Sequence, residues 1–265
     1  MPFVERQHQR IFYQVTGAGP AIVLGHSFLC SGEMWDGQVP RLAESYRVVN
    51  IDYRGHGGSS RVERPFTLYD LLDDTLAVLD ELDIATAIWA GLSTGGMVAL
   101  RAALTVPERV DAIVVADASA DAEPLYPKLK YRTLALGARL VGMRPFLPAV
   151  APIMFAPATL AENPVLVEEW KPIPLSMGMP CVVRFLDAVI RRDSLLDRLP
   201  EIEVPTLIVV GENDRAQPLA RSRQMVAAIP GAMLAIIPQA GHLSAMEQPE
   251  AFNRALLEFL GSLRA

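Results

Sequence analysis

Ser93 is the residue of this sequence whose surroundings best suit covalent chemistry. It lies in AGLSTGGM (90–97), between Gly91 and Gly95, directly after an apolar run and directly before a helix-like segment. A strand-to-helix turn this sharp holds the serine in a strained backbone conformation, and only small neighbours let the chain pass. The hydroxyl then projects beside a helix N-terminus, whose N–H groups suit a developing oxyanion. The spacing predicts a nucleophile, and a serine in a flexible glycine-rich loop is the simpler alternative.

A serine hydroxyl is a poor nucleophile without a base, so one of the four histidines must serve it. His242, in QAGHLSAMEQP, follows the last strand-like run and precedes the final helix-like segment. Its loop should therefore open at the same sheet edge as Ser93. His8 lies in a polar stretch and His56 in a glycine turn, so we expect them to be solvated and structural, respectively. We predict His242 as the base, with a loop-packing histidine as the alternative.

An acid should orient the imidazole and favour its protonated form. Asp214, in VVGENDRAQP, follows a strand-like run and should lie at the carboxyl edge of the sheet. Asp117 ends the preceding strand-like run and is a competitor, because an acid after the neighbouring strand can also reach the histidine. We favour Asp214, and we interpret Asp117 and Glu212 as groups that form hydrogen bonds within loops.

The elements that must position these side chains alternate along the chain. Most strand-length runs are apolar throughout, which is typical of parallel strands covered on both faces. These runs are 11–15, 21–25, 47–51, 86–91, 112–117, 206–211 and 233–238. Helical periodicity or proline boundaries mark the segments 67–82, 94–106, 218–229 and 249–263. The alternation predicts an α/β fold with a mostly parallel sheet flanked by helices.

Residues 120–198 break this alternation and carry ten of the 21 prolines. Proline at that density prevents long helices, while the apolar content needs something to cover. We expect a helical cap at 120–198, inserted into an α/β core made of 1–119 and 199–265. Apolar cap residues could line a substrate pocket, although ordinary core packing is the simpler interpretation. The residues that we predict to bind substrate are Met154, Phe155, Trp170 and Phe185.

Composition excludes several classes of function. The chain has 265 residues and a formal net charge of −6 with scattered acids, which argues against a nucleic acid partner. No apolar run reaches the roughly 18 residues of a membrane helix, and the N-terminus lacks a signal core, so we expect a cytoplasmic protein. Cys30 and Cys181 lack metal-type spacing and are expected to be free thiols. No metal or cofactor is expected, and the sequence leaves the oligomeric state open.

A family resemblance follows from five segments: LGHSFLCSGEMW, IDYRGHGGSS, GLSTGGM, VVGENDRAQP and AGHLSAMEQP. Together with the order Ser93, Asp214, His242, they resemble the α/β-hydrolase superfamily, in particular its small capped bacterial carboxylesterases and 3-oxoadipate enol-lactonases. The resemblance implies the α/β-hydrolase fold and an oxyanion hole formed by the N–H groups of Phe28 and Thr94. The chain departs from the usual pattern with Ser27 after His26 and with the small Thr94 after the nucleophile.

The resemblance implies a serine hydrolase that cleaves carboxylic esters or lactones through an acyl-enzyme, acting on a small molecule without a cofactor. The 3-oxoadipate enol-lactonase reaction is one specific alternative. Carbon–carbon bond hydrolases and perhydrolases share the same serine arrangement, and a hydrolase-fold receptor can retain it. Haloalkane dehalogenases and epoxide hydrolases are disfavoured because they have Asp where Ser93 stands.

Overall fold

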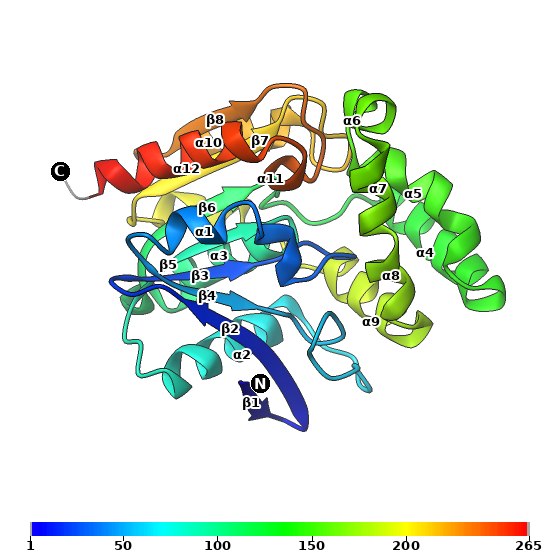
Figure 1. Cartoon of the computed structure of the whole chain (residues 1–265), viewed down its shortest axis with the longest axis horizontal. Helices are drawn as coiled ribbons and strands as arrows, with labels where there is room; N and C mark the ends of the chain where they lie inside the picture. Colours follow the sequence, from blue (N-terminus) through cyan, green and yellow to red (C-terminus); the bar gives the residue numbers. More distant parts are fainter. Residues whose placement is uncertain (1, 264–265) are drawn as a thin grey trace.

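The computed structural model describes residues 2–263, apart from the side chains of Pro127 and Lys130, and its centre is a twisted eight-stranded sheet (Figure 1). The strand order is β1-β2-β4-β3-β5-β6-β7-β8, with antiparallel pairing of β1 to β2 and of β2 to β4 and parallel pairing elsewhere. The strands are β1 Phe3–Arg6, β2 Gln9–Thr16, β3 Ala21–Gly25, β4 Arg47–Ile51, β5 Ala87–Leu92, β6 Val110–Ala116, β7 Thr206–Gly211 and β8 Met233–Ile237. This architecture confirms the predicted α/β class.

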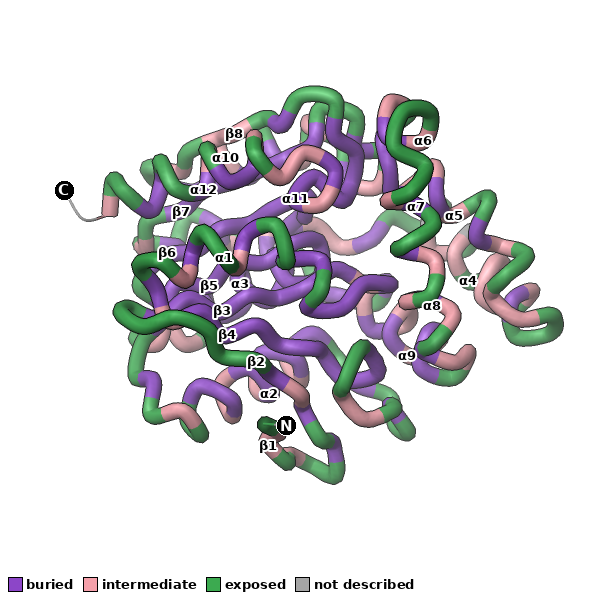
Figure 2. Tube along the Cα trace, in the orientation of Figure 1, coloured by how far each residue is buried: buried purple, intermediate pink, exposed green. Residues whose placement is uncertain are grey.

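The apolar runs of the sequence all become strands. Every residue of β3, β5 and β7 is buried, as expected for strands covered on both faces (Figure 2). The sequence analysis missed β1, whose residues FVER carry no continuous apolar run. This strand lies at the edge of the sheet and pairs with β2, with Phe3 opposite Phe12.

Helices cover both faces of the sheet, with α1 and α12 in front and α3 behind it in Figure 1. The helices outside residues 120–198 are α1 Val39–Leu42, α2 Leu68–Glu81, α3 Thr94–Thr105, α10 Leu219–Ala228, α11 Ser244–Glu247 and α12 Pro249–Ser262. The four predicted helical segments match α2, α3, α10 and α12 to within a few residues. Helix α3 packs against β5 and β6, directly beneath the turn that carries Ser93.

Six helices between β6 and β7 lie beyond the carboxyl ends of the parallel strands (Figure 1). They are α4 Leu125–Val141, α5 Leu147–Met154, α6 Pro157–Glu162, α7 Pro164–Trp170, α8 Pro172–Ser176 and α9 Met179–Ile190. Most are short, as the prolines predict, but α4 has 17 residues because 128–141 contains no proline. We refer to these helices as the cap. The division into a core of 1–119 and 199–265 and a cap of 120–198 stays a prediction.

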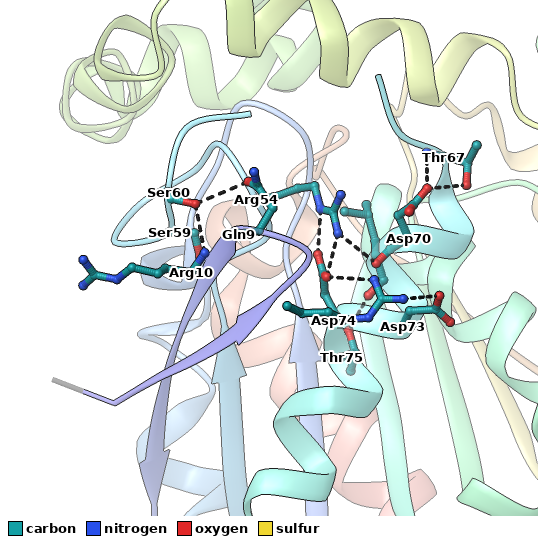
Figure 3. Close-up of polar contacts among 12 residues, drawn as sticks. Gln9, Arg10, Arg54, Ser59, Ser60, Thr67, Asp70, Asp73, Asp74 and Thr75 are labelled. Carbon is teal, nitrogen blue, oxygen red and sulfur yellow. Dashed lines mark hydrogen bonds and ion pairs between the residues drawn. The ribbon is translucent and has the colours of Figure 1, made fainter. Parts of the chain in front are cut away.

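A buried ion pair fixes the loop that follows β4 (Figure 3). The guanidinium of Arg54 donates hydrogen bonds of 2.7 and 2.6 Å to the two carboxylate oxygens of Asp74, on α2. Helix α2 itself begins with a capping box formed by Thr67 and Asp70. The loop thereby acquires a defined position, which matters because it contacts the active-site region through Tyr53.

No single helix among residues 2–263 is long and apolar enough to cross a membrane. The segments Pro164–Ser176 and Met179–Ile190 reach that length and composition only together, across a bend of 99°.

Candidate active site

The turn between β5 and α3 forces Ser93 into an unusual backbone conformation, with φ 54° and ψ −108°. The turn is so tight that a Cβ atom on Gly91 would lie 2.1 Å from the carbonyl carbon of Gly95. A Cβ atom on Gly95 would lie 2.1 Å from the carbonyl oxygen of Gly25, on the neighbouring strand β3. Glycine is therefore required at both flanking positions, and the strained serine is presented at the carboxyl edge of the sheet.

Three side chains that are distant in sequence meet at this edge. The Nε2 atom of His242 lies 3.0 Å from the Oγ atom of Ser93, and its Nδ1 atom lies 2.9 Å from Oδ2 of Asp214. Ser93 follows β5, Asp214 follows β7, and His242 follows β8. The structure thus brings together the three residues that the sequence predicts as nucleophile, acid and base.

Asp214 also fixes the tautomer of His242. Its Oδ1 atom accepts hydrogen bonds of 2.8 Å from the backbone N–H groups of Ala216 and Gln217, so the carboxylate is held in place. A carboxylate can only accept, so Nδ1 of His242 must carry the proton that Oδ2 receives. The lone pair of Nε2 therefore faces the Ser93 hydroxyl and can take its proton.

The charges around His242 favour its protonated form. Burial by itself lowers the pKa of the imidazole, but the adjacent charge of Asp214 and its hydrogen bond outweigh burial. Asp117 and Glu247 add to this effect, and the net result is a pKa raised above the ordinary value of 6.5. The site thus stabilises the imidazolium that forms when the base takes up a proton.

Asp117, the alternative acid, makes no hydrogen bond to His242. Its carboxylate is buried and accepts hydrogen bonds from the backbone N–H of Gly211, at 2.7 Å, and from the hydroxyl of Ser244. Burial and the nearby charge of Asp214 raise the pKa of Asp117 well above its ordinary value. Its contacts join the end of β7 to α11, so the geometry favours Asp214 over Asp117 as the acid.

The remaining polar candidates have structural surroundings. Glu212 accepts a hydrogen bond of 3.2 Å from the backbone N–H of Gln239, within the loops after β7 and β8. His8 is exposed. His56 is buried against the ring of Phe185, with a centroid distance of 4.4 Å, and burial lowers its pKa well below 6.5.

Phe28 and Thr94 both lie on the wall of the cavity that contains Ser93 and His242. Their backbone N–H groups have no acceptor among the described residues, so they are free to receive an oxyanion. His26 braces this loop: its Nε2 atom accepts from the backbone N–H of Tyr53 at 2.8 Å, and its Nδ1 donates to the carbonyl of Ser27 at 2.7 Å. Burial lowers the pKa of His26, consistent with a neutral imidazole in this role.

A cavity of about 150 Å³ opens next to Ser93 and His242, between the sheet edge and the cap. Its wall is mainly aliphatic and aromatic, and the cap supplies most of it. Other lining residues are Leu29, Leu134, Ala135, Ala138, Met143, Phe146, Val150, Ile153, Met154, Val182, Leu186, Val189 and Ile190. Of the four residues predicted to bind substrate, only Met154 lies on this wall.

Trp170 lies in α7, Phe185 in α9 and Phe155 directly after α5, and none of the three lines this cavity. That they contact the substrate stays a prediction, and the structure gives each of them another partner. Trp170 donates its indole N–H to the carbonyl of Leu29 at 2.9 Å and packs edge-on against Phe155. Phe185 stacks on Phe28, with ring centroids 5.2 Å apart. These side chains are buried because they hold the loop after β3, which carries one predicted oxyanion donor.

Glu247 is a buried carboxylate that the sequence analysis did not single out. It accepts hydrogen bonds from the N–H groups of Gly241 (2.8 Å) and Leu243 (3.3 Å), the two residues that flank His242. It also accepts from the N–H of Ala156 (2.7 Å), the residue directly before α6, and from the hydroxyl of Thr159 (2.5 Å), in α6 of the cap. Burial raises its pKa. Glu247 therefore joins the histidine loop to the cap.

Among residues 2–263, no group of three or more His, Cys, Asp or Glu side chains is arranged to hold a metal ion. Cys30 and Cys181 are free and buried.

Comparisons with known proteins show the family and the fold of the chain. A family model described as "Alpha/beta hydrolase family" matches residues 22–255. The chain is 28% identical to 3-oxoadipate enol-lactonase 2 of Acinetobacter baylyi, covering 89% of this chain and 87% of that protein. It is also similar to the solved enol-lactonase of Burkholderia xenovorans (TM-score 0.92, 28% identity, covering 98% and 100% of the two chains). A thermophilic esterase of Thermogutta terrifontis matches with a TM-score of 0.92, 28% identity and coverage of 97% and 95%.

Proposed function

Because this chain belongs to the alpha/beta hydrolase family, we propose that it is a serine hydrolase that cleaves carboxylic esters or lactones through an acyl-enzyme intermediate. The observation that carries the proposal is the hydrogen-bonded chain Ser93–His242–Asp214, with 3.0 and 2.9 Å between the paired atoms. The similarity to an enol-lactonase and an esterase supports the same class of substrate.

In the first step, Nε2 of His242 takes the proton of the Ser93 hydroxyl while Oγ attacks the carbonyl carbon. A bond forms between Oγ and that carbon, and the electron pair of the carbonyl moves to its oxygen. The N–H groups of Phe28 and Thr94 then stabilise the oxyanion, and each such donor is typically worth about 3–4 kcal/mol of barrier.

Collapse of this tetrahedral intermediate breaks the bond to the alkoxide leaving group, which receives the proton from His242. Water then attacks the acyl carbon while Nε2 of His242 takes its proton. The second tetrahedral intermediate collapses, the bond between that carbon and Oγ breaks, and Oγ receives the proton from His242, so the acid leaves and Ser93 is regenerated. In a lactone the leaving oxygen stays tethered to the acyl group, so a single hydroxy acid is released. Asp214 keeps the imidazole oriented through both half-reactions.

The experiment that tests this function is a steady-state assay with 4-nitrophenyl esters of increasing chain length and with small lactones. Wild-type protein should turn over many times per active site, whereas Ser93→Ala should be inactive and fold normally by circular dichroism. One equivalent of product without turnover would instead indicate a hydrolase-fold receptor. Equal rates for wild type and Ser93→Ala would refute the proposal.

A further inference from the structure

The cavity wall carries one charged group apart from the proposed catalytic residues, and that group is an acid. Ser27, Ser93, Thr94 and His242 line the cavity on the side of the proposed catalytic residues. The other polar residues that line it are Glu123, Tyr131 and Gln217. Among the described residues, neither lysine nor arginine lines it. No lysine or arginine side chain that the structure describes is therefore placed to meet a substrate in the cavity.

Glu123 is held at the wall by a buried cation. It lies in the segment between β6 and α4, is 8% exposed, and forms an ion pair through Oε2 with Nη1 of Arg192, 2.8 Å away. Oε1 has no hydrogen-bond partner among the described residues. One oxygen of the carboxylate is thus anchored, and the other remains available at the cavity wall.

Arg192 cannot serve a substrate in place of Glu123, because it lies behind the wall. Its side chain is only 1% exposed. Its other donors are used by protein acceptors: the carbonyls of Asp121 (2.9 Å) and Val189 (3.0 Å) and the hydroxyl of Ser119 (3.3 Å). A substrate carboxylate in the cavity would find no free guanidinium group.

We propose that this cavity accepts esters or lactones with an uncharged apolar chain and rejects those that carry a carboxylate, with Glu123 as the specificity-determining residue. The inference rests on the proposed hydrolase function and names its substrate class. It separates this chain from the enol-lactonases that it resembles, because 3-oxoadipate is a dicarboxylic acid and its enol-lactone keeps a free carboxylate.

Two physical effects act in the same direction. A carboxylate that enters an apolar cavity loses its water, and its charge must then be compensated by the wall. Apart from the proposed catalytic machinery, the described wall offers the neutral groups of Tyr131 and Gln217 and no cation. Arg192 offsets part of the Glu123 charge, but Glu123 lines the wall and Arg192 lies behind it, so the nearer, negative charge repels a second carboxylate. An uncharged chain of the same length experiences neither effect and gains contacts with α4, α5 and α9.

The test compares two esters that differ only at the far end of the acyl chain: methyl 4-nitrophenyl adipate, which is neutral, and mono-4-nitrophenyl adipate, which is anionic at pH 7.5. We expect wild type to prefer the neutral ester by about 100-fold in kcat/KM, the scale of discrimination against an unpaired polar group in a binding site. Glu123→Gln keeps the shape and an acceptor for Arg192, and should reduce this preference by about tenfold.

Two further variants serve as controls. Glu123→Asp keeps the charge and should retain most of the preference, while Glu169→Gln removes an exposed acid of α7 outside the cavity wall and should leave the preference unchanged. Equal kcat/KM for both esters in wild type, or an unchanged ratio in folded Glu123→Gln, would overturn the inference while leaving the hydrolase function intact. If wild type hydrolysed neither adipate ester and none of the esters and lactones in the panel above, the proposed function itself would be overturned, and this inference with it.

Discussion

The Nε2 atom of His242 lies 3.0 Å from the Oγ atom of Ser93, although 149 positions separate the two residues in the sequence. The contact exists because parallel strands end at one edge of the sheet, where the loops after β5 and β8 meet. Ser93 is held there by a strained turn and His242 by Asp214, so a proton can pass from the hydroxyl to the imidazole without rearrangement.

Replacement of His242 by alanine should reduce kcat/KM for a 4-nitrophenyl ester by about 10⁴-fold or more, because the nucleophile then lacks its base. The fold should remain intact, as judged by circular dichroism and melting temperature. His8→Ala is the matched control, since His8 is exposed and far from the site in sequence, and it should leave kcat/KM within a factor of about two. Comparable losses in both variants would contradict the assignment of the base.

Substitution by asparagine should have different effects at Asp214 and at Asp117. Asp214→Asn removes the acceptor of the His242 Nδ1 proton and should lower kcat by about 10³–10⁴-fold with little effect on stability. Asp117→Asn disturbs the contacts to Gly211 and Ser244 and should cost about 1–2 kcal/mol of unfolding free energy with a much smaller loss of kcat. Parallel kinetics and urea denaturation separate the two effects, and the reverse pattern would make Asp117 the acid.

The pH dependence of kcat/KM should report the raised pKa of His242. Burial works against protonation, but the charge and hydrogen bond of Asp214 prevail. The base must be neutral to act, so activity should be lost as pH falls through a pKa above 6.5. Asp214→Asn should shift this acid limb of the residual activity to lower pH, and an unmoved limb would argue that another group titrates.

The raised pKa of His242 also affects the stability of the fold, and this effect depends on pH in the opposite direction to activity. Because the folded state holds the His242 proton more tightly than the unfolded state, its contribution is fully present below the ordinary pKa of 6.5 and is lost as pH rises through the folded pKa. We expect the stability difference between wild type and His242→Gln to shrink as pH rises above 6.5. Urea denaturation at several pH values measures it, and a difference that grows over this range would be inconsistent with a raised pKa.

Glu247 should act as a positioning residue for His242. Glu247→Gln keeps the shape but offers one acceptor oxygen to four donors, so it should lower kcat more than it raises KM and should cost about 1–3 kcal/mol of stability. Glu250→Gln, which changes an exposed acid three residues away, is the control. A purely structural role would instead leave kcat at its wild-type value in the folded fraction.

The cap should set the preferred acyl chain length. Ala135 lies on the cavity wall, so Ala135→Phe should narrow the cavity. We expect kcat/KM for 4-nitrophenyl octanoate to fall by about tenfold or more, and kcat/KM for 4-nitrophenyl acetate to stay near the wild-type value. Leu140→Phe is the matched control because Leu140 lies on the same helix and is 81% exposed. Chain-length profiles of the three proteins measure the effect, and identical profiles would place the acyl chain elsewhere.

The sequence predicts the sheet and the meeting of the three side chains because both follow from local rules. Continuous apolar runs such as 206–211 form buried parallel strands, and loops after such strands must share one edge. The strand β1 was missed because its pairing partner, and not its own composition, makes it a strand.

The cavity wall was harder to predict, since composition does not reveal which side of a cap helix faces the substrate. Trp170 and Phe185 are large and apolar, but they are used to hold the loop that carries Leu29 and Phe28. Glu123 and Glu247 carry no local signal, because their partners are a buried arginine and backbone N–H groups that only the folded chain brings near them.

Covalent trapping of the nucleophile tests the central claim most directly. The protein is incubated with an ethyl 4-nitrophenyl alkylphosphonate, a neutral diester, then digested and mapped by mass spectrometry. We predict one phosphonyl group per chain, on the peptide that contains Ser93, with loss of esterase activity in proportion to labelling and no labelling of Ser93→Ala. A label on another residue, or full activity after stoichiometric labelling of Ser93, would contradict the mechanism.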